Sequence, residues 1–115
     1  MAPDQPGPAS EPSVRFEMSI SESDVIGVYS NFLGVWHTAH EFTLDFAVTQ
    51  PAMAGADDDG NAVTRVPCQV VARVRVPPTV LFDFLRTINE NLSNYEGTFG
   101  SIQRPESGTV YPPDA

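Results

Sequence analysis

The residues whose types and spacing could support chemistry lie in one short stretch, at a turn between two apolar runs. His37, His40 and Glu41 form a His-x-x-His-Glu pattern, and Asp45 follows four residues later. Two imidazoles and a carboxylate could hold a divalent metal such as zinc, iron or nickel. In the other reading, His37 or Glu41 fixes the turn by hydrogen bonds while His40 faces solvent. The structural reading is favoured because the spacing matches no specific metal motif.

Other catalytic arrangements are not predicted. Ser30 and Cys68 fall in predicted strands and lack the strand-to-helix turn or the neighbouring base that activates a nucleophile. Glu41 and Asp45 would lie about 13 Å apart on one strand at ~3.3 Å per residue, which is too far for a shared proton. We therefore expect a protein that is not an enzyme and needs no cofactor.

The charge balance excludes two classes of partner. The chain of 115 residues has fifteen acidic and six basic side chains and a net charge of −9, and all six basic residues are arginine. Nucleic acids and anionic membranes both attract basic surfaces, so we expect neither as a partner. The lysine-free composition, rich in Ala, Pro, Gly and Val, is typical of a high-GC bacterium. A single cysteine and the lack of a secretion signal or an apolar span predict a cytoplasmic protein.

Hydropathy patterns predict four strands and one helix. Residues 14–20 alternate between apolar and polar side chains, and residues 41–49 do so most clearly, as half-buried strands do. Residues 26–36 are apolar on both faces, which predicts a central strand. A strand at 66–76 follows a mobile acidic loop at 54–60 and places Cys68 in the core. Pro78 then opens a helix over 78–96.

These elements predict an α+β domain over residues 14–102. Its four-stranded antiparallel sheet carries the C-terminal helix on one face, because the helix has a single apolar stripe. Gly27 and Gly34 indicate a bulge or the close approach of another backbone. Residues 1–13 and 103–115 are rich in proline and are predicted to be flexible tails.

A family resemblance emerges from the ordered motifs. The pattern combines Gly27-Val-Tyr-Ser-Asn31, His37, Glu41-Phe42, Asp45-Phe46, Arg73, Pro78, Glu90-Asn91-Leu92, Tyr95-Glu96 and Phe99-Gly100. It resembles the small prokaryotic family called domain of unknown function 3467. The loop after residue 50 is longer and more acidic here than in that family, and the helix lacks the usual basic residues. A looser likeness, in element order alone, is to SecB-like export chaperones.

The function predicted from these features is binding rather than catalysis. One helix covers only one face of a sheet. The strand at 26–36, which is apolar on both faces, is therefore left with an exposed apolar surface, and its candidate residues are Tyr29, Phe32, Leu33, Val35 and Trp36. We expect this surface to bind a second copy in a homodimer or higher oligomer, or a protein client as a SecB-like chaperone would. The alternatives are a metal-binding protein using His37, His40 and Glu41, and a structural subunit of a larger bacterial assembly.

Overall fold

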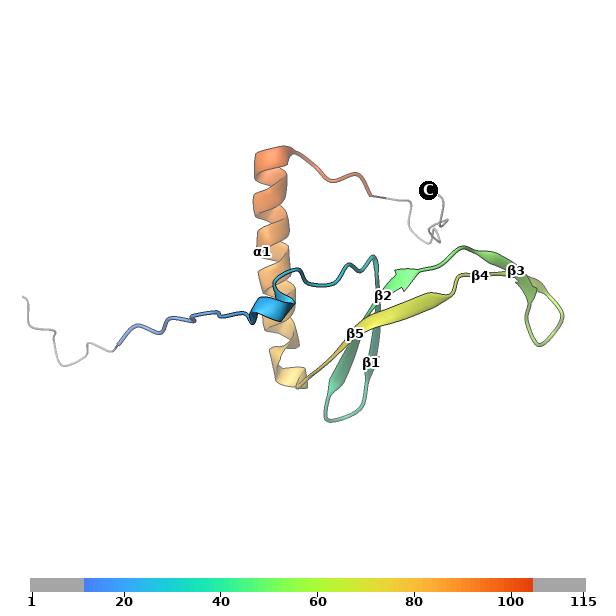
Figure 1. Cartoon of the computed structure of the whole chain (residues 1–115), viewed down its shortest axis with the longest axis horizontal. Coiled ribbons are helices and arrows are strands. Elements are labelled where there is room, and N and C mark those ends of the chain that lie inside the picture. The colour runs from blue at the N-terminus through green and yellow to red at the C-terminus, as the bar shows by residue number, and fades with distance from the viewer. Residues whose placement is uncertain (1–11, 105–115) are drawn as a thin grey trace, which may run out of the picture.

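The computed structural model describes residues 12–104, which form two antiparallel sheets and one long helix (Figure 1). The larger sheet has the strand order β1-β2-β5, and β3 pairs with β4 in a separate hairpin. Residues 1–11 and 105–115, which contain most of the two predicted tails, lie outside the described residues. The elements are β1 (Phe32–His37), β2 (Phe42–Thr49), β3 (Met53–Ala56), β4 (Ala62–Arg65), β5 (Cys68–Val76), α1 (Leu81–Phe99) and the short 3₁₀ turns η1 (Glu22–Asp24) and η2 (Pro78–Val80).

The predicted α+β class is confirmed, but the strands are distributed differently from the prediction. Residues 14–20 are extended without being paired into a sheet, and β1 begins at Phe32 rather than near Ile26. The segment 54–60, predicted as a mobile acidic loop, supplies the end of β3 and the turn of the β3-β4 hairpin. Asp57 closes this turn by accepting hydrogen bonds from the backbone amides of Asp59 and Asn61. Alternation predicts which residues can form strands, but pairing also requires a neighbouring edge.

Strand register gives the larger sheet two distinct faces. Val35 lies opposite Leu44, which lies opposite Val74, whereas Gly34, Asp45 and Arg73 are aligned on the other side. Because side chains alternate along a strand, each face can be read from this register. The apolar face contains Leu33, Val35, His37, Phe42, Leu44, Phe46, Ala72, Val74 and Val76. The mixed face contains Phe32, Gly34, Trp36, Thr43, Asp45, Ala47, Val70, Arg73 and Arg75.

A bulge in β5 corrects the predicted position of Cys68. The partner of Phe46 is Ala72, but the partner of Ala47 is Val70, so Val71 is an extra residue in β5. Past this bulge the alternation changes phase. Cys68 consequently pairs with Thr49 at the end of the sheet and is exposed, not part of a core.

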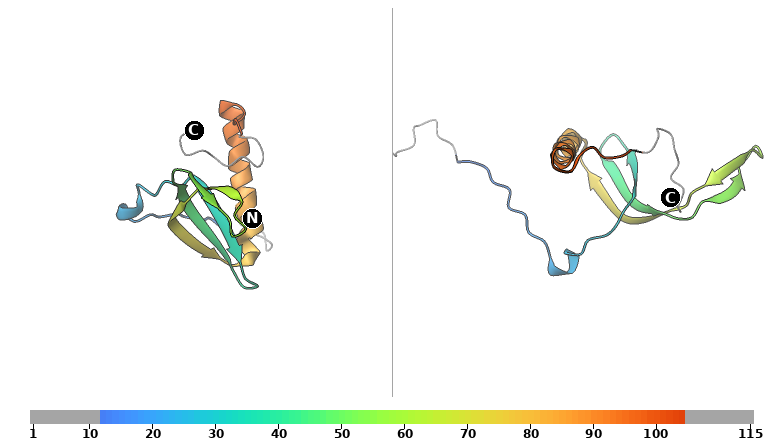
Figure 2. Two further views of the ribbon diagram at one scale, coloured as in Figure 1. Left: turned by 90° about the vertical axis from the view of Figure 1, so that its right-hand side faces the viewer. Right: turned by 90° about the horizontal axis from the view of Figure 1, so that it is seen from above.

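The helix α1 stands apart from the sheet. It follows β5 after Pro77 and η2, and ends at Gly100, whose φ of 93° is readily adopted by glycine. Figures 1 and 2 show it as a separate rod, and its contacts with described elements other than η2 are slight. The predicted packing of the helix on the sheet is therefore not observed. An apolar stripe predicts that a helix needs cover, but it does not say which surface provides it.

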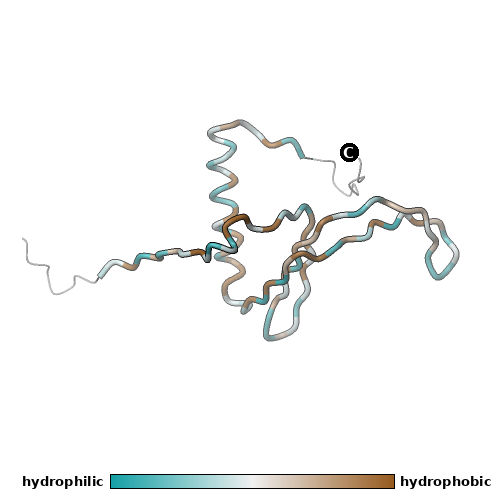
Figure 3. Tube along the Cα trace, in the orientation of Figure 1, coloured by the Kyte–Doolittle hydropathy of each residue, from teal (hydrophilic) through white to brown (hydrophobic). Residues whose placement is uncertain are grey.

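The described chain is extended and has very little core. Its Cα radius of gyration is 21.7 Å, against roughly 13 Å for a compact domain of about 100 residues. Among residues 12–104, Ala47 and Val76 are the only buried apolar side chains. Figure 3 shows apolar positions recurring along residues 14–20, the arm before η1, and also along the strands and along α1.

The start of β1 is tied to the end of β2 by two polar residues. The Ser30 hydroxyl lies 2.8 Å from the carbonyl oxygen of Ala47 and 3.0 Å from that of Phe32. The Asn31 side chain exchanges hydrogen bonds with Thr49, accepting from its backbone amide at 3.0 Å. These contacts fix where the edge strand enters the sheet.

We predict that Ser30→Ala lowers the free energy of unfolding by about 1 kcal/mol, because it removes a half-buried hydrogen bond to the sheet. Urea denaturation at a fixed protein concentration measures this change. Ser101→Ala, at an exposed serine after α1, is the control and should change the free energy of unfolding much less. Equal effects of the two substitutions would contradict the assigned role of Ser30.

Candidate functional site on the sheet

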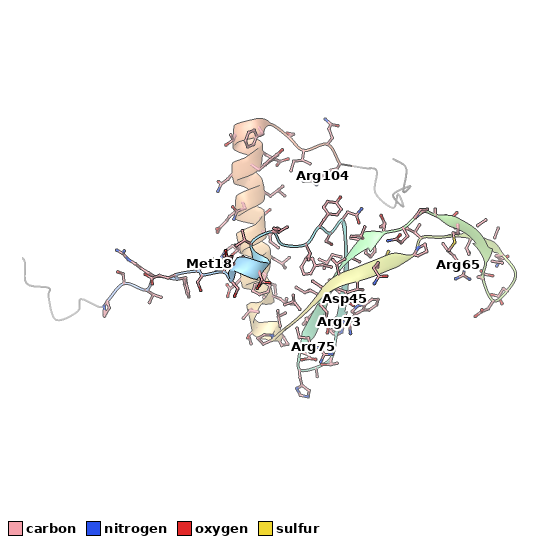
Figure 4. All side chains as sticks on the ribbon, viewed as in Figure 1. Met18, Asp45, Arg65, Arg73, Arg75 and Arg104 are labelled. Carbon is pink, nitrogen blue, oxygen red and sulfur yellow. The ribbon has the colours of Figure 1, made fainter. Side chains whose placement is uncertain are left out.

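The best-defined polar cluster of the described chain lies on the mixed face around Asp45. This side chain is at the centre of β2, and the residue is only 6% exposed. Arg73 of β5 donates from Nε to Oδ1 at 2.6 Å and from Nη2 to Oδ2 at 2.9 Å. Trp36 of β1 donates from Nε1 to Oδ2 at 2.9 Å. One carboxylate therefore connects all three strands of the sheet, and Figure 4 shows Asp45 beside Arg73.

The electrostatics of this cluster favour a charged, fully engaged carboxylate. The hydrogen bonds from Arg73 lower the pKa of Asp45, and burial of the carboxylate opposes this shift only in part. The N–H of Trp36 lowers the pKa further. A general base works best with a pKa near the working pH, and a metal ligand needs free lone pairs. Asp45 meets neither requirement, so the geometry assigns it to holding the sheet and orienting Trp36.

Trp36 offers a broad apolar surface that is held in place. Its indole ring lies over Gly34, where a Cβ atom would come within 3.4 Å of Cζ2. The close approach predicted at Gly34 is therefore made by a side chain rather than by another backbone. Most of the ring remains exposed, with Phe32 and Val70 exposed on the same face. Anchored aromatic side chains of this kind are frequent hot spots in protein interfaces.

The residues predicted as a metal site are separated by the sheet. His37 lies on the apolar face, where its ring packs on that of Phe42 with centroids 5.2 Å apart. Glu41 lies on the mixed-face side, with Oε1 3.5 Å from Nη1 of Arg75. His40 is exposed in the turn, and its backbone amide donates to the Thr38 hydroxyl. Within residues 12–104 no group of three or more His, Cys, Asp and Glu residues is placed to hold a metal ion.

The predicted interaction residues are exposed but do not form one surface. Leu33 and Val35 lie on the apolar face, whereas Phe32 and Trp36 lie on the mixed face. Tyr29 precedes β1 and is also exposed. Strand alternation predicts this division between the faces, and the structure adds that neither face is covered by α1.

Sequence reasoning missed the partnership of Asp45 with Arg73 and Trp36. The available signal was a pair of opposite charges, each at the centre of an alternating strand and each on its polar side. Sequence alone does not give the register that places Asp45 opposite Arg73. Alternation along residues 41–49 places Asp45 on the polar side of its strand, and the structure agrees, but the side chain is buried there by its partners.

The fold and its polar cluster define an α+β protein with an antiparallel sheet. The family described as "Protein of unknown function (DUF3467)" matches residues 2–104, and the chain belongs to this family. No curated protein and no solved structure gave a significant match. The likeness to SecB-like chaperones is thus not shown. Among the described residues, no helix is both long enough and apolar enough to cross a membrane.

We predict that Asp45→Asn lowers the melting temperature at neutral pH by several degrees, because Arg73 loses its charged partner. The pKa of Asp45 is lowered on folding, so its contribution is complete above the unfolded value near 3.8 and is lost as pH falls through the lower folded value. Wild-type stability should therefore fall in acid more steeply than that of Asp45→Asn.

Thermal melts from pH 7 to pH 2 measure both effects, and fluorescence of Trp36, the single tryptophan, follows protonation of the carboxylate directly. Asp58→Asn removes the same charge from an exposed turn and is the control. Parallel pH profiles for wild type and Asp45→Asn would rule out the role given to this cluster.

Proposed function

We propose that this protein is a non-enzymatic, oligomeric binding or adaptor protein whose apolar surfaces are completed by other polypeptide chains. One observation carries the proposal: apolar side chains remain exposed on the sheet, on α1 and on the arm before η1. The exposed members include Leu33, Val35, Trp36, Val74, Phe84, Leu85, Ile88, Tyr95, Phe99, Phe16 and Met18.

The physical argument is a shortage of buried apolar surface in a single copy. Ordering one residue costs about 1–2 kcal/mol of backbone entropy, and burial of apolar surface is the main term that offsets it. A compact domain of this length would bury roughly two-thirds of its unfolded surface, whereas here only Ala47 and Val76 are buried apolar residues among those described. Obligate homodimers often have no stable folded monomer, because their core forms between subunits.

The stripe on α1 is the clearest of the uncovered surfaces. Leu85 and Ile88 are more than 60% exposed, and Tyr95 and Phe99 pack on each other with ring centroids 4.9 Å apart. A second copy can cover such a stripe with the matching surface of its own helix or sheet. An unfolded client segment can occupy the same surface, and the net charge of −9 keeps the assembled protein dispersed.

The metal-binding alternative has no support in the geometry, because His37 and Glu41 lie on opposite faces of the sheet. The non-enzymatic part of the proposal is supported by Asp45, whose oxygens are already engaged. We place the protein in the bacterial cytoplasm, where an exposed, unpaired thiol such as that of Cys68 remains reduced.

We predict that wild-type protein at micromolar concentration is a dimer or larger, with a mass at least twice the 12.5 kDa of one chain. Ile88→Asp should raise the protein concentration at which half of the assembly dissociates by roughly tenfold or more, because it buries a charge in the shared apolar surface. Asn94→Asp adds the same charge outside the stripe and should leave the mass unchanged. Light scattering measures both, and a wild-type mass of one chain would refute the oligomeric part of the proposal.

We also predict that excess wild-type protein slows the aggregation of an unfolded model client. Trp36→Ala should reduce this protection several-fold, since the exposed indole is the largest anchored apolar group of the mixed face. Turbidity during thermal aggregation of the client is the measurement. Thr43→Ala, on the same face but without an aromatic ring, is the matched control. No protection at stoichiometric excess would count against the chaperone form of the proposal.

A further inference from the structure

The segment from Val14 to Ile20, called the arm below, has the sequence of a strand but no strand partner. Its apolar and polar side chains alternate, and Phe16 and Met18 are 92% and 97% exposed. No backbone hydrogen bond joins residues 14–20 to any other described residue. Figure 1 and the right panel of Figure 2 show the arm running away from the sheet of its own chain. Pairing with the edge of a sheet would satisfy the backbone hydrogen-bonding groups of this segment and cover its four exposed apolar side chains.

The β5 strand supplies an edge of matching length and chemistry. It is the last strand of the larger sheet, spans nine residues without a proline, and pairs on one side only. Natural proteins rarely leave so long an apolar edge open. An arm paired with this edge would continue the apolar face with Val14, Phe16, Met18 and Ile20, beside Val74 and Val76.

Charge decides between the two free edges of the sheet. With its apolar residues on the apolar face, the arm places Arg15, Glu17 and Ser19 on the mixed face. On that face β5 presents Arg73 and Arg75, whose side chains are 54% and 61% exposed and can still accept an acidic neighbour. The β1 edge presents Phe32, Gly34 and Trp36 there and has no basic group. Glu17 therefore complements the β5 edge and not the β1 edge.

We propose that the arm of each chain adds to the β5 edge of a second copy, so that two subunits exchange strands. Figure 4 shows Met18 on the arm well away from Arg73 and Arg75 of the same chain. Residues 21–31 join the arm to β1, the edge of its own sheet that lies opposite β5. Exchange between copies places each arm on a β5 edge without crossing its own sheet. This inference rests on the proposed self-association and names one contact within it, in addition to the surface of α1.

Charge reversal across the proposed contact tests the exchange. Glu17→Arg and Arg75→Glu should each raise the concentration for half-dissociation by roughly tenfold, because each dimer then holds two repulsive pairs. Co-expression of the two variants with different tags should restore wild-type affinity, since both contacts of the mixed dimer join opposite charges. Native mass spectrometry should find mainly the mixed dimer. Ser19→Arg, which changes the same strand face without removing Glu17, is the control for added charge.

The outcomes separate this inference from the proposed function. Variants that associate like wild type would show that the arm does not pair with β5, and weakening without rescue in the mixture would show pairing within one chain. Because Arg75 also contacts Glu41 of its own chain, Arg75→Glu changes a contact within the subunit as well, so hydrogen exchange on wild type is an independent measurement. Amides of residues 14–20 should be protected in the assembly and lose protection on dilution. An intact oligomer with unprotected arms overturns the exchange alone, whereas a monomeric wild type overturns the proposed function as well.

Discussion

The structure is dominated by one constraint, which is that a single copy leaves almost all of its apolar side chains exposed among the described residues. These side chains lie on three separate parts of the chain: both faces of the larger sheet, one uncovered stripe of α1, and the extended arm. The sheet and the helix have local order from backbone hydrogen bonds, whereas the arm has none, and hydrogen bonds alone contribute modestly to net stability in water. The missing term is apolar burial, and the function proposed above assigns it to contacts between chains.

Within one copy, the sheet is organised around a buried charge rather than around a hydrophobic core. Asp45 accepts from Arg73 and Trp36, so the three strands are held by one carboxylate at the centre of the mixed face. Such a pair fixes register strongly, because a shift by one residue would move Asp45 to the apolar face. It also holds the Trp36 ring in one orientation while leaving it exposed. The cluster thus connects local order in the sheet with the surface proposed to bind other chains.

Sequence patterns predict some elements of this fold and not others. The strand at 41–49 and the helix after Pro78 follow from alternation, helical spacing and proline position, because these signals arise from neighbours along the chain. The β5 bulge at Val71, the hairpin across residues 53–65 and the shortened β1 were not predictable in the same way. Each depends on which backbone lies alongside, and a hydropathy pattern carries no information about its partner.

By itself the sequence determined the α+β class, the family, the acidic surface and the presence of more apolar residues than one helix and one sheet can cover. Only the tertiary structure decided that His37 and Glu41 are divided by the sheet, that Asp45 is buried beneath Trp36 and Arg73, and that α1 leaves its stripe open. The physical reason is the range of the interactions. Composition and periodicity show which side chains favour burial or a polar partner, whereas strand register and packing determine which neighbouring residue provides that contact.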